Sequence, residues 1–223
     1  GRHRDAGSVL RRRERADTIS TMSIALAPPA PSTLLDLLDR SRVRDVVAVV
    51  GFALLTAVAA QITIPLGFTP VPLTGQTFAV LLAGGVLGSR RGGLSMLLYV
   101  ALGAIGLPFY ANGDGGWTAA TGATSGYLVG FIVAAIAIGL MAERGQDRKL
   151  STSIPAFIAG TTIIYAIGAG WLAYDLGLPL TAAAGEPSAV SLGVAPFLVG
   201  DVFKALLAGA MLPAAWRLFD TPR

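Results

Sequence analysis

Residues 199–204 read Val-Gly-Asp-Val-Phe-Lys, and they lie inside an apolar stretch that extends from Leu192 to Leu218. Apart from Asp201 and Lys204, this stretch carries no charge before Arg217. Its length is that of a membrane-spanning helix, where an ionisable side chain is costly unless it finds a partner. The two residues are therefore expected to pair with each other or to bind a polar solute.

The composition of the whole chain agrees with a membrane location. Of its 223 residues, 53% are hydrophobic and 13% are charged, and the mean hydropathy is +0.66. A soluble domain carries about 25% charged residues, so the composition predicts an integral membrane protein. The chain has no cysteine, and its one histidine, His3, lies in a polar segment, so neither a metal site nor a cofactor is expected. It has no P-loop, G-x-S-x-G or H-E-x-x-H motif, and we therefore expect no enzymatic activity.

Apolar stretches of membrane length predict an all-α protein with six transmembrane helices. The expected segments are residues 43–62, 73–88, 93–109, 124–141, 152–174 and 194–219. A tight basic turn is expected at residues 89–92, between the second and third segments. Those two segments are short for a membrane span, so their ends are expected to lie in protein or to line a water-filled cavity.

The basic residues predict the orientation of these segments. Sixteen of the 17 lysines and arginines lie before or at the start of the first segment, in alternate loops or at the C-terminal end, and the three opposite loops have none. Cytoplasmic loops of membrane proteins are enriched in Lys and Arg, so both termini are expected in the cytoplasm. Residues 65–72, 112–122 and 175–186 are then external. Lys204 is the one basic residue that this pattern does not use.

The two ends of the chain are expected to lie outside the membrane domain of residues 43–219. Residues 1–42 are rich in arginine and proline and predict a disordered cytoplasmic extension, and residues 220–223 a short cytoplasmic tail. No uninterrupted apolar stretch follows the first arginines, which argues against a secretory signal. Met22 is a plausible translation start, and one hypothesis is that residues 1–21 precede the true start. Residues 32–39 are typical of a short amphipathic helix on the membrane surface.

Asp201 and Lys204 are three residues apart and therefore share one face of the sixth helix. Helical side chains lean toward the N-terminal end, which here is the external end. Lys204 would lie about 15 Å below that end, near the middle of the membrane. A pocket that opens outward around one ammonium group suits a small anionic solute. The alternative is an Asp–Lys pair that only fixes helix packing; a proton relay would need a second membrane carboxylate or histidine, which the segments lack.

Other polar residues are expected near the external face, where they could complete a binding site. Thr74 and Gln76 lie where the proline-rich loop enters the second segment, and Asn112 and Tyr127 belong to the second external loop and the top of the fourth segment. Amides and hydroxyls pair with neutral polar groups, and aromatic rings flank apolar ones. Each residue could instead serve the membrane interface or its own helix.

Four stretches together resemble the BioY family, the biotin-binding membrane subunits, or S components, of energy-coupling factor (ECF) transporters. They are PVPLTGQTFAVLLAGGVLGSRRGG at residues 70–93, LLYVALGAIGLPFYANGDGG at 97–116, TGATSGYLVGF at 121–131 and GDVFK at 200–204. The similarity extends over residues 46–218. It implies the six-helix S-component fold and a site for biotin that is open to the outside beneath the first external loop.

The resemblance also implies roles for particular residues. Lys204, supported by Asp201, would pair with the biotin carboxylate or otherwise anchor the ligand, and Thr74, Gln76, Asn112 and Tyr127 would lie near the site. Ala53 and Ala57, in an A-x-x-x-A pattern, would form the docking surface for the transmembrane coupling protein that recruits two ATPases. Biotin, the lipid bilayer and these subunits are the expected partners, and nucleic acid is not. The alternative function is a stand-alone vitamin carrier that needs no ATPase.

Overall fold

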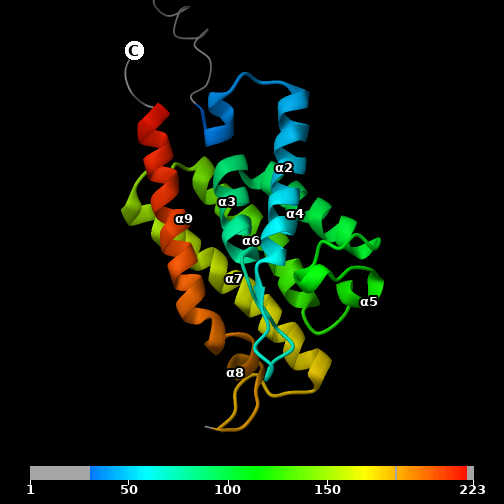
Figure 1. The fold of residues 1–223 in the computed structure, drawn as a ribbon. Helices are drawn as coiled ribbons and strands as arrows, with labels where there is room; N and C mark the ends of the chain where they lie inside the picture. The colour runs from blue at the N-terminus through cyan, green and yellow to red at the C-terminus, as the bar shows by residue number, and fades with distance from the viewer. Residues whose placement is uncertain (1–30, 184, 220–223) are drawn as a thin grey trace, which may run out of the picture. The chain divides into compact units, whose positions relative to one another are not determined.

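The structure, a computed structural model, describes residues 31–183 and 185–219 (Figure 1). The predicted N-terminal extension up to residue 30, the start at Met22 and the C-terminal tail lie outside these residues. Residues from 32 onward form one compact unit. Its long helices are α2 (Arg42–Gln61), α3 (Gln76–Leu87), α4 (Ser89–Ala104), α6 (Ser125–Glu143), α7 (Leu150–Leu176) and α9 (Leu198–Phe219).

Short elements connect these helices at their ends. The single turns are η1 (Leu34–Leu37), η2 (Ala111–Gly113), α5 (Trp117–Ala120), α8 (Ala189–Gly193) and η3 (Ala195–Phe197). Two strands of two residues each, β1 (Thr63–Ile64) and β2 (Leu73–Thr74), pair antiparallel, with Thr63 opposite Thr74. This pairing folds the proline-rich loop back over the end of α2. It also explains why α3 begins at Gln76 and not at Leu73, as the sequence predicted.

Four stretches of described helix are long and apolar enough to cross a membrane. They are α2, α6, α7 and the stretch Ala189–Phe219 that contains α8, η3 and α9. Helix α3 is apolar but has 12 residues, and α4 has 16. A full span needs about 20 residues. Six long helices are therefore present at the predicted places, whereas six spans and the cytoplasmic position of both termini remain predictions.

The expected tight turn at residues 89–92 is wrong, because α4 already begins at Ser89. Only Gly88, with φ of +83°, separates α3 from α4. The carboxylate of Glu143 accepts hydrogen bonds from the backbone N–H (2.7 Å) and the hydroxyl (2.8 Å) of Ser89. A carboxylate that satisfies a first-turn N–H stabilises a helix start. The side chains of Arg90 and Arg91 are thereby placed on the first turn of α4.

Three other predicted boundaries differ from the structure. The third segment ends at Ala104 and not at Phe109, because Gly106 adopts a φ of +111°, which ends the helical conformation. The sixth segment is broken before α9, and Pro196 lies in η3. The helix expected at residues 32–39 is reduced to the one turn of η1.

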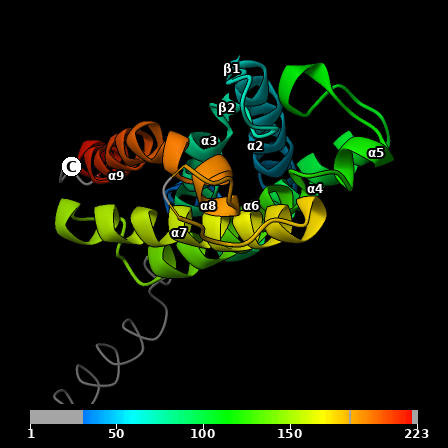
Figure 2. The same ribbon diagram turned by 90° about the horizontal axis from the view of Figure 1, so that it is seen from below.

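Helix α6 lies at the centre of the packing. It contacts α3, α4 and α7, while α9 packs on α7 and α3, and α2 packs on α4 and α3. Figures 1 and 2 both show α3 between α9 and α2. Gly139 makes the approach of α6 to α4 possible, since a Cβ there would lie 2.2 Å from the backbone nitrogen of Ser89. Small residues at such contacts are typical of membrane helices.

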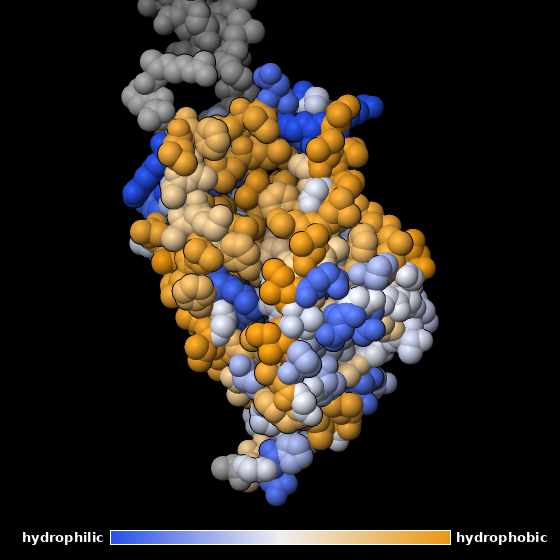
Figure 3. Space-filling model, in the orientation of Figure 1, coloured by the Kyte–Doolittle hydropathy of each residue, from blue (hydrophilic) through white to orange (hydrophobic). Residues whose placement is uncertain are grey.

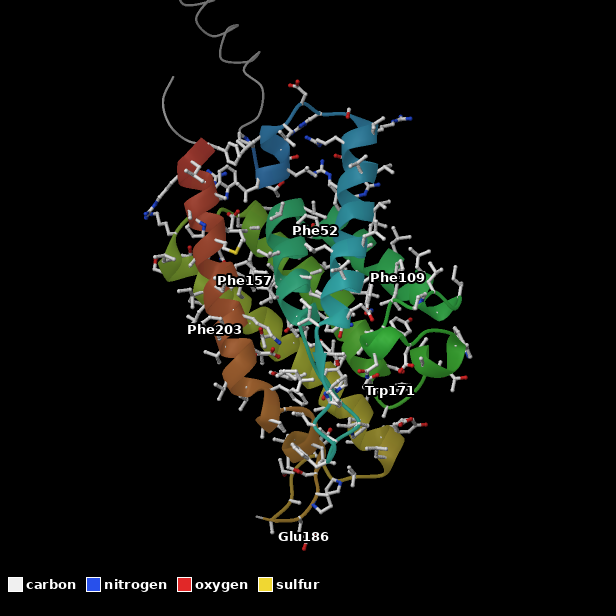
Figure 4. The ribbon with its side chains drawn as sticks, in the orientation of Figure 1. Phe52, Phe109, Phe157, Trp171, Glu186 and Phe203 are labelled. Atoms are coloured by element: carbon white, nitrogen blue, oxygen red, sulfur yellow. The ribbon has the colours of Figure 1, made fainter. Side chains whose placement is uncertain are left out.

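Apolar side chains dominate much of the surface seen in Figure 3. On α2 the exposed residues recur at helical spacing, as Val43, Val47, Leu54 and Val58 show, and on α9 they include Phe203 and Leu206. Figure 4 shows Phe203 on the outer side of α9. A surface of this kind is suited to hydrocarbon and not to water. The fold thus exposes apolar faces that would suit lipid.

Candidate ligand-binding site

A cavity of about 300 Å³ lies among the proline-rich loop, the loop between α4 and α6, the first turns of α3, α6 and α9 and the middle of α7. This volume is at the lower end of the range for small-molecule sites. All six residues that the sequence analysis predicted for the site line it: Thr74, Gln76, Asn112, Tyr127, Asp201 and Lys204. They come from four separate parts of the chain, and the fold brings them to one place.

Asp201 is buried at one end of this cavity and accepts three hydrogen bonds. The hydroxyl of Thr77 donates to Oδ1 (2.9 Å), the ammonium of Lys204 donates to the same oxygen (2.7 Å), and the hydroxyl of Tyr165 donates to Oδ2 (2.6 Å). The side chain of Asp201 is 5% exposed and that of Lys204 is 19% exposed. A carboxylate with three donors and a counter-charge is well compensated for its burial. The pair is therefore a preorganised polar end to the cavity.

Lys204 has no free N–H in this arrangement. Besides Asp201, its ammonium donates to the backbone oxygen of Thr74 (2.5 Å) and to the hydroxyl of Thr77 (3.2 Å), and an ammonium has three donors. A second carboxylate, that of Asp114, lines the exposed end of the cavity. The lining thus holds one lysine and two aspartates. This charge balance differs from the sequence-based expectation of a pocket around one ammonium group that suits a small anionic solute.

The neighbouring residues Thr74 and Gln76 also bond to each other. The hydroxyl of Thr74 donates to Oε1 of Gln76 (2.7 Å), and the amide Nε2 of Gln76 donates to the hydroxyl of Tyr99 on α4. Gln76 opens α3 directly after β2, and its side chain is buried. The short strand pairing therefore fixes where this amide points. Gln76 is also one of the residues that line the cavity.

Tyr127 and Asn112 take different positions in the lining. The hydroxyl of Tyr127 donates to the backbone oxygen of Gly193 (2.7 Å), so its ring, and not its hydroxyl, is the surface offered to a ligand. Asn112 lies in η2 with φ of +62°, a left-handed conformation that asparagine tolerates. It is exposed and marks the open side of the cavity. Aromatic rings such as Tyr127 and Phe131 form the apolar wall between the two polar ends.

Tyr165 is the residue at this site that the sequence analysis missed. It lies on α7, is buried, and donates to Asp201 from the opposite side to Lys204. A lone tyrosine within an apolar segment is a weak signal, because most such residues lie at membrane interfaces. Only the packing of α7 against α9 shows that its hydroxyl faces a carboxylate.

Comparison with known proteins places this chain in a family. A model of the BioY family matches residues 30–221. The chain belongs to the BioY family. The resemblance found in the four sequence stretches is thereby confirmed.

Several relatives of this BioY chain are named as biotin transporters. The probable biotin transporter BioY of Pyrococcus horikoshii is 41% identical, over 75% of this chain and 93% of that protein. The biotin transporter BioY of Rhizobium etli is 38% identical, over 75% of this chain and 90% of the relative. That of Rhodobacter capsulatus is 42% identical, over 70% of this chain and 84% of the relative.

A solved structure shares the fold. The crystal structure of the S-component for biotin from an ECF-type ABC transporter matches this BioY chain with a TM-score of 0.70 and 25% sequence identity, covering 80% of this chain and 95% of the other. The predicted all-α S-component fold is therefore confirmed. Together with the apolar helices, the family identifies the chain as a membrane protein.

The expected docking residues of this BioY chain are not on its surface. Ala53 is 1% exposed and Ala57 is 7% exposed, and both belong to the same buried cluster as Met96 and Tyr99 of α4. A separate subunit could touch them only if α2 moved away from α4. The A-x-x-x-A pattern here allows close packing of α2 within the chain, which is the usual role of small residues at that spacing. The face of α2 that a partner could reach is the opposite one.

Proposed function

We propose that this chain binds biotin in the cavity beside Asp201 and Lys204 and serves as the substrate-capturing subunit of an ECF-type transporter. The observation that carries the proposal is the buried Asp201–Lys204 pair at the end of a ligand-sized cavity, in a chain whose relatives are named biotin transporters. The likeness to an S-component for biotin supports the same assignment. The site would face the outside of the cell membrane, and partner ATPases would supply the energy for delivery.

The charge balance of the cavity supports one orientation of biotin. The fused ureido ring carries N–H donors, and the Asp201 carboxylate has lone pairs beyond its three hydrogen bonds that can accept from them. The valerate carboxylate has no free cation to meet at Lys204. A carboxylate buried without compensation is costly, whereas at the open end near Asn112 water can still reach it. We therefore propose that the ureido ring contacts the Asp201–Lys204 pair and that the carboxylate faces the opening.

Two biotin derivatives test this orientation with purified protein in detergent. Biotin methyl ester lacks the charged carboxylate, and 2-iminobiotin replaces the ureido oxygen by nitrogen. We expect the ester to bind within about tenfold of biotin, a loss of at most about 1.4 kcal/mol, and iminobiotin to lose more. The reverse order of losses would place the carboxylate at Lys204.

Lys204→Ala tests the site itself. Loss of the lysine leaves the buried Asp201 without its counter-charge, so biotin binding is expected to weaken by about 2–5 kcal/mol. Arg144→Ala, an exposed arginine outside the cavity, is the matched control and should bind as the unmodified protein does. Wild-type protein that does not bind biotin would overturn the proposed function. Unchanged binding by Lys204→Ala would overturn only the assignment of the site.

The stand-alone carrier remains the second candidate for how transport is driven. Reconstitution into vesicles separates the two, because a carrier without a motor would accelerate uptake of labelled biotin by itself. We expect accelerated net uptake only when a coupling protein and ATPases are present with ATP. Uptake by this chain alone would favour the carrier.

A further inference from the structure

A second, larger cavity lies at the opposite end of the helices from the biotin cavity. Its volume is about 1120 Å³, and it is bounded by η1 and by the first turns of α2 and α4. Five arginines and three carboxylates line it. Figure 3 shows hydrophilic surface at this end of α2 and hydrophobic surface below it. The biotin site does not use this cavity.

Two of the five arginines already have partners. Arg91 contacts Asp36 (3.0 Å) and Asp45 (3.1 Å), and Arg44 contacts Asp45 (2.6 Å). Arg44 also donates to the backbone oxygens of Leu35 and Leu38. The third carboxylate, Glu143, caps the start of α4 through Ser89. The acidic groups of the cavity are therefore all satisfied.

Three arginines remain in excess of these pairs. Among the described residues, the side chains of Arg40, Arg42 and Arg90 make no hydrogen bond and no ion pair, and all three residues are exposed at the cavity. Helices α2 and α4 both begin at this end, so their positive dipole ends add to the same field. The chain's own first 30 residues are a poor occupant, because they carry six arginines and only three carboxylates. The excess positive charge of these arginines therefore favours an anionic partner from outside the chain.

The wall below the arginines is apolar and exposed. Val46 and Val50 of α2 and Leu94 of α4 line it, and they are 61%, 39% and 48% exposed. An amphiphile with a phosphate at one end and a hydrocarbon chain at the other matches this arrangement better than an inorganic anion does. Basic pockets between membrane helices are known to hold anionic lipid head groups. We propose that this cavity binds an anionic phospholipid, with its phosphate at Arg42 and Arg90 and an acyl chain along α2 and α4.

Native mass spectrometry of the full chain in detergent tests the proposal. The probes are phosphatidylglycerol, zwitterionic phosphatidylcholine and inorganic phosphate. We expect the protein to retain phosphatidylglycerol at least tenfold more than phosphatidylcholine, and millimolar inorganic phosphate not to displace it. Equal retention of the two lipids would overturn the proposal, as a protein partner would then be the better candidate. Displacement by phosphate would also overturn it, in favour of a simple anion site.

A matched pair of double variants locates the site. Arg42→Gln with Arg90→Gln should lower phosphatidylglycerol retention at least tenfold. Arg144→Gln with Arg217→Gln removes the same charge from exposed positions outside the cavity and should leave retention unchanged. An equal loss in both variants would show a general charge effect and no site. Biotin binding is measured in parallel as proof of folding, since none of these residues lines the biotin cavity.

Discussion

At the scale of single residues, the two buried aspartates of the described structure are satisfied to different degrees. Asp201 accepts from three donors, one of them charged. Asp147, in the loop between α6 and α7, accepts from the indole N–H of Trp216 at Oδ2, while its Oδ1 is buried without a hydrogen-bond partner. The hydrogen-bonding capacity of Asp201 is well used, whereas one buried oxygen of Asp147 is left without a partner. The two residues therefore call for different experiments.

Tyr165→Phe should destabilise the fold, because Asp201 loses the hydrogen bond that the Tyr165 hydroxyl donates. The change removes one hydrogen bond to a buried charge and keeps the ring, so the free energy of unfolding is expected to fall by about 1.5–3 kcal/mol. Tyr174→Phe is the matched control on the same helix, where the ring is 80% exposed. Thermal unfolding in detergent measures both. Equal melting temperatures for the two variants would show that the Tyr165 hydroxyl contributes nothing.

Asp147 should make stability depend on pH. Burial raises the pKa of its carboxyl above the ordinary 3.8, although the hydrogen bond from Trp216 and the nearby Arg148 oppose the shift. A folded state with a raised carboxyl pKa binds its proton more tightly than the unfolded state. The stabilisation is therefore fully present below 3.8 and is lost as pH rises through the folded pKa.

Asp147→Asn should remove this dependence while it keeps an acceptor for Trp216. We expect the melting temperature of the Asn variant, relative to the unmodified protein, to increase between about pH 4 and about pH 7. Hydrogen bonds from Ser32, Arg91 and Thr33 outweigh burial and lower the pKa of Asp36, which makes stability fall in acid. Asp36 is present in both proteins, so its effect cancels in the difference. A difference that stays constant with pH would contradict the assignment to Asp147.

At the scale of elements, α2 has one buried face made of small residues and one exposed face made of large apolar residues. Small residues, among them Ala53, Ala57 and Ala60, are buried against α3 and α4. Large ones such as Val47, Leu54 and Val58 are exposed. A soluble helix would bury the larger side chains, but lipid removes the hydrophobic penalty for exposing them, and close backbone contact favours small ones inside.

Ala53→Trp should therefore damage the fold and not only the coupling to a partner. A large ring has no space on the buried face, and overpacking of this kind typically costs about 1–3 kcal/mol. Leu54→Trp, one residue on and 46% exposed, is the control and should melt as the unmodified protein does. Thermal unfolding and biotin binding in detergent check both variants. If Ala53→Trp is as stable as the control, α2 can leave α4 readily, and the alanines regain their expected docking role.

At the scale of the whole molecule, the two cavities lie at opposite ends of the described helices. The loop with Glu186 lies at one end in Figure 4, and the start of α2 lies at the other. The distribution of arginines predicts that the α2 end is cytoplasmic. The biotin cavity would then open outward, and the arginine-lined cavity would lie among the lipid head groups of the inner leaflet.

Labelling of single cysteines tests this orientation, because the chain has none of its own. Glu186→Cys lies in the loop before α8, and Lys149→Cys lies at the exposed start of α7. A membrane-impermeant maleimide should label the first variant in intact cells and the second only after permeabilisation. Reversed labelling would place the biotin cavity on the cytoplasmic side.

The sequence predicted much of the fold and six residues that line the smaller cavity. The positions of the long helices follow from apolar length. Asp201 and Lys204 were expected from their place in an apolar helix, and the other four residues from the loops near the external face and from the family resemblance. Helix ends were less predictable, since the start of α4 depends on Glu143, 54 residues further along the chain. The buried state of Ala53 was not predictable either, because a small-residue face suits packing within the chain as well as between chains.

From its sequence alone, this protein is a membrane protein with a costly charged pair in its last long helix, because composition and spacing are properties of the chain itself. Its resemblance to the BioY family rests on four sequence stretches. Only the tertiary structure decided what that pair meets. Lys204 is satisfied by Thr74, Thr77 and Asp201, and Tyr165 closes the site from α7. Thr74, Thr77 and Tyr165 are 36 or more residues from Asp201 or Lys204 in the chain. Whether an ammonium is free for a ligand depends on such distant partners, and packing alone brings them within hydrogen-bonding distance.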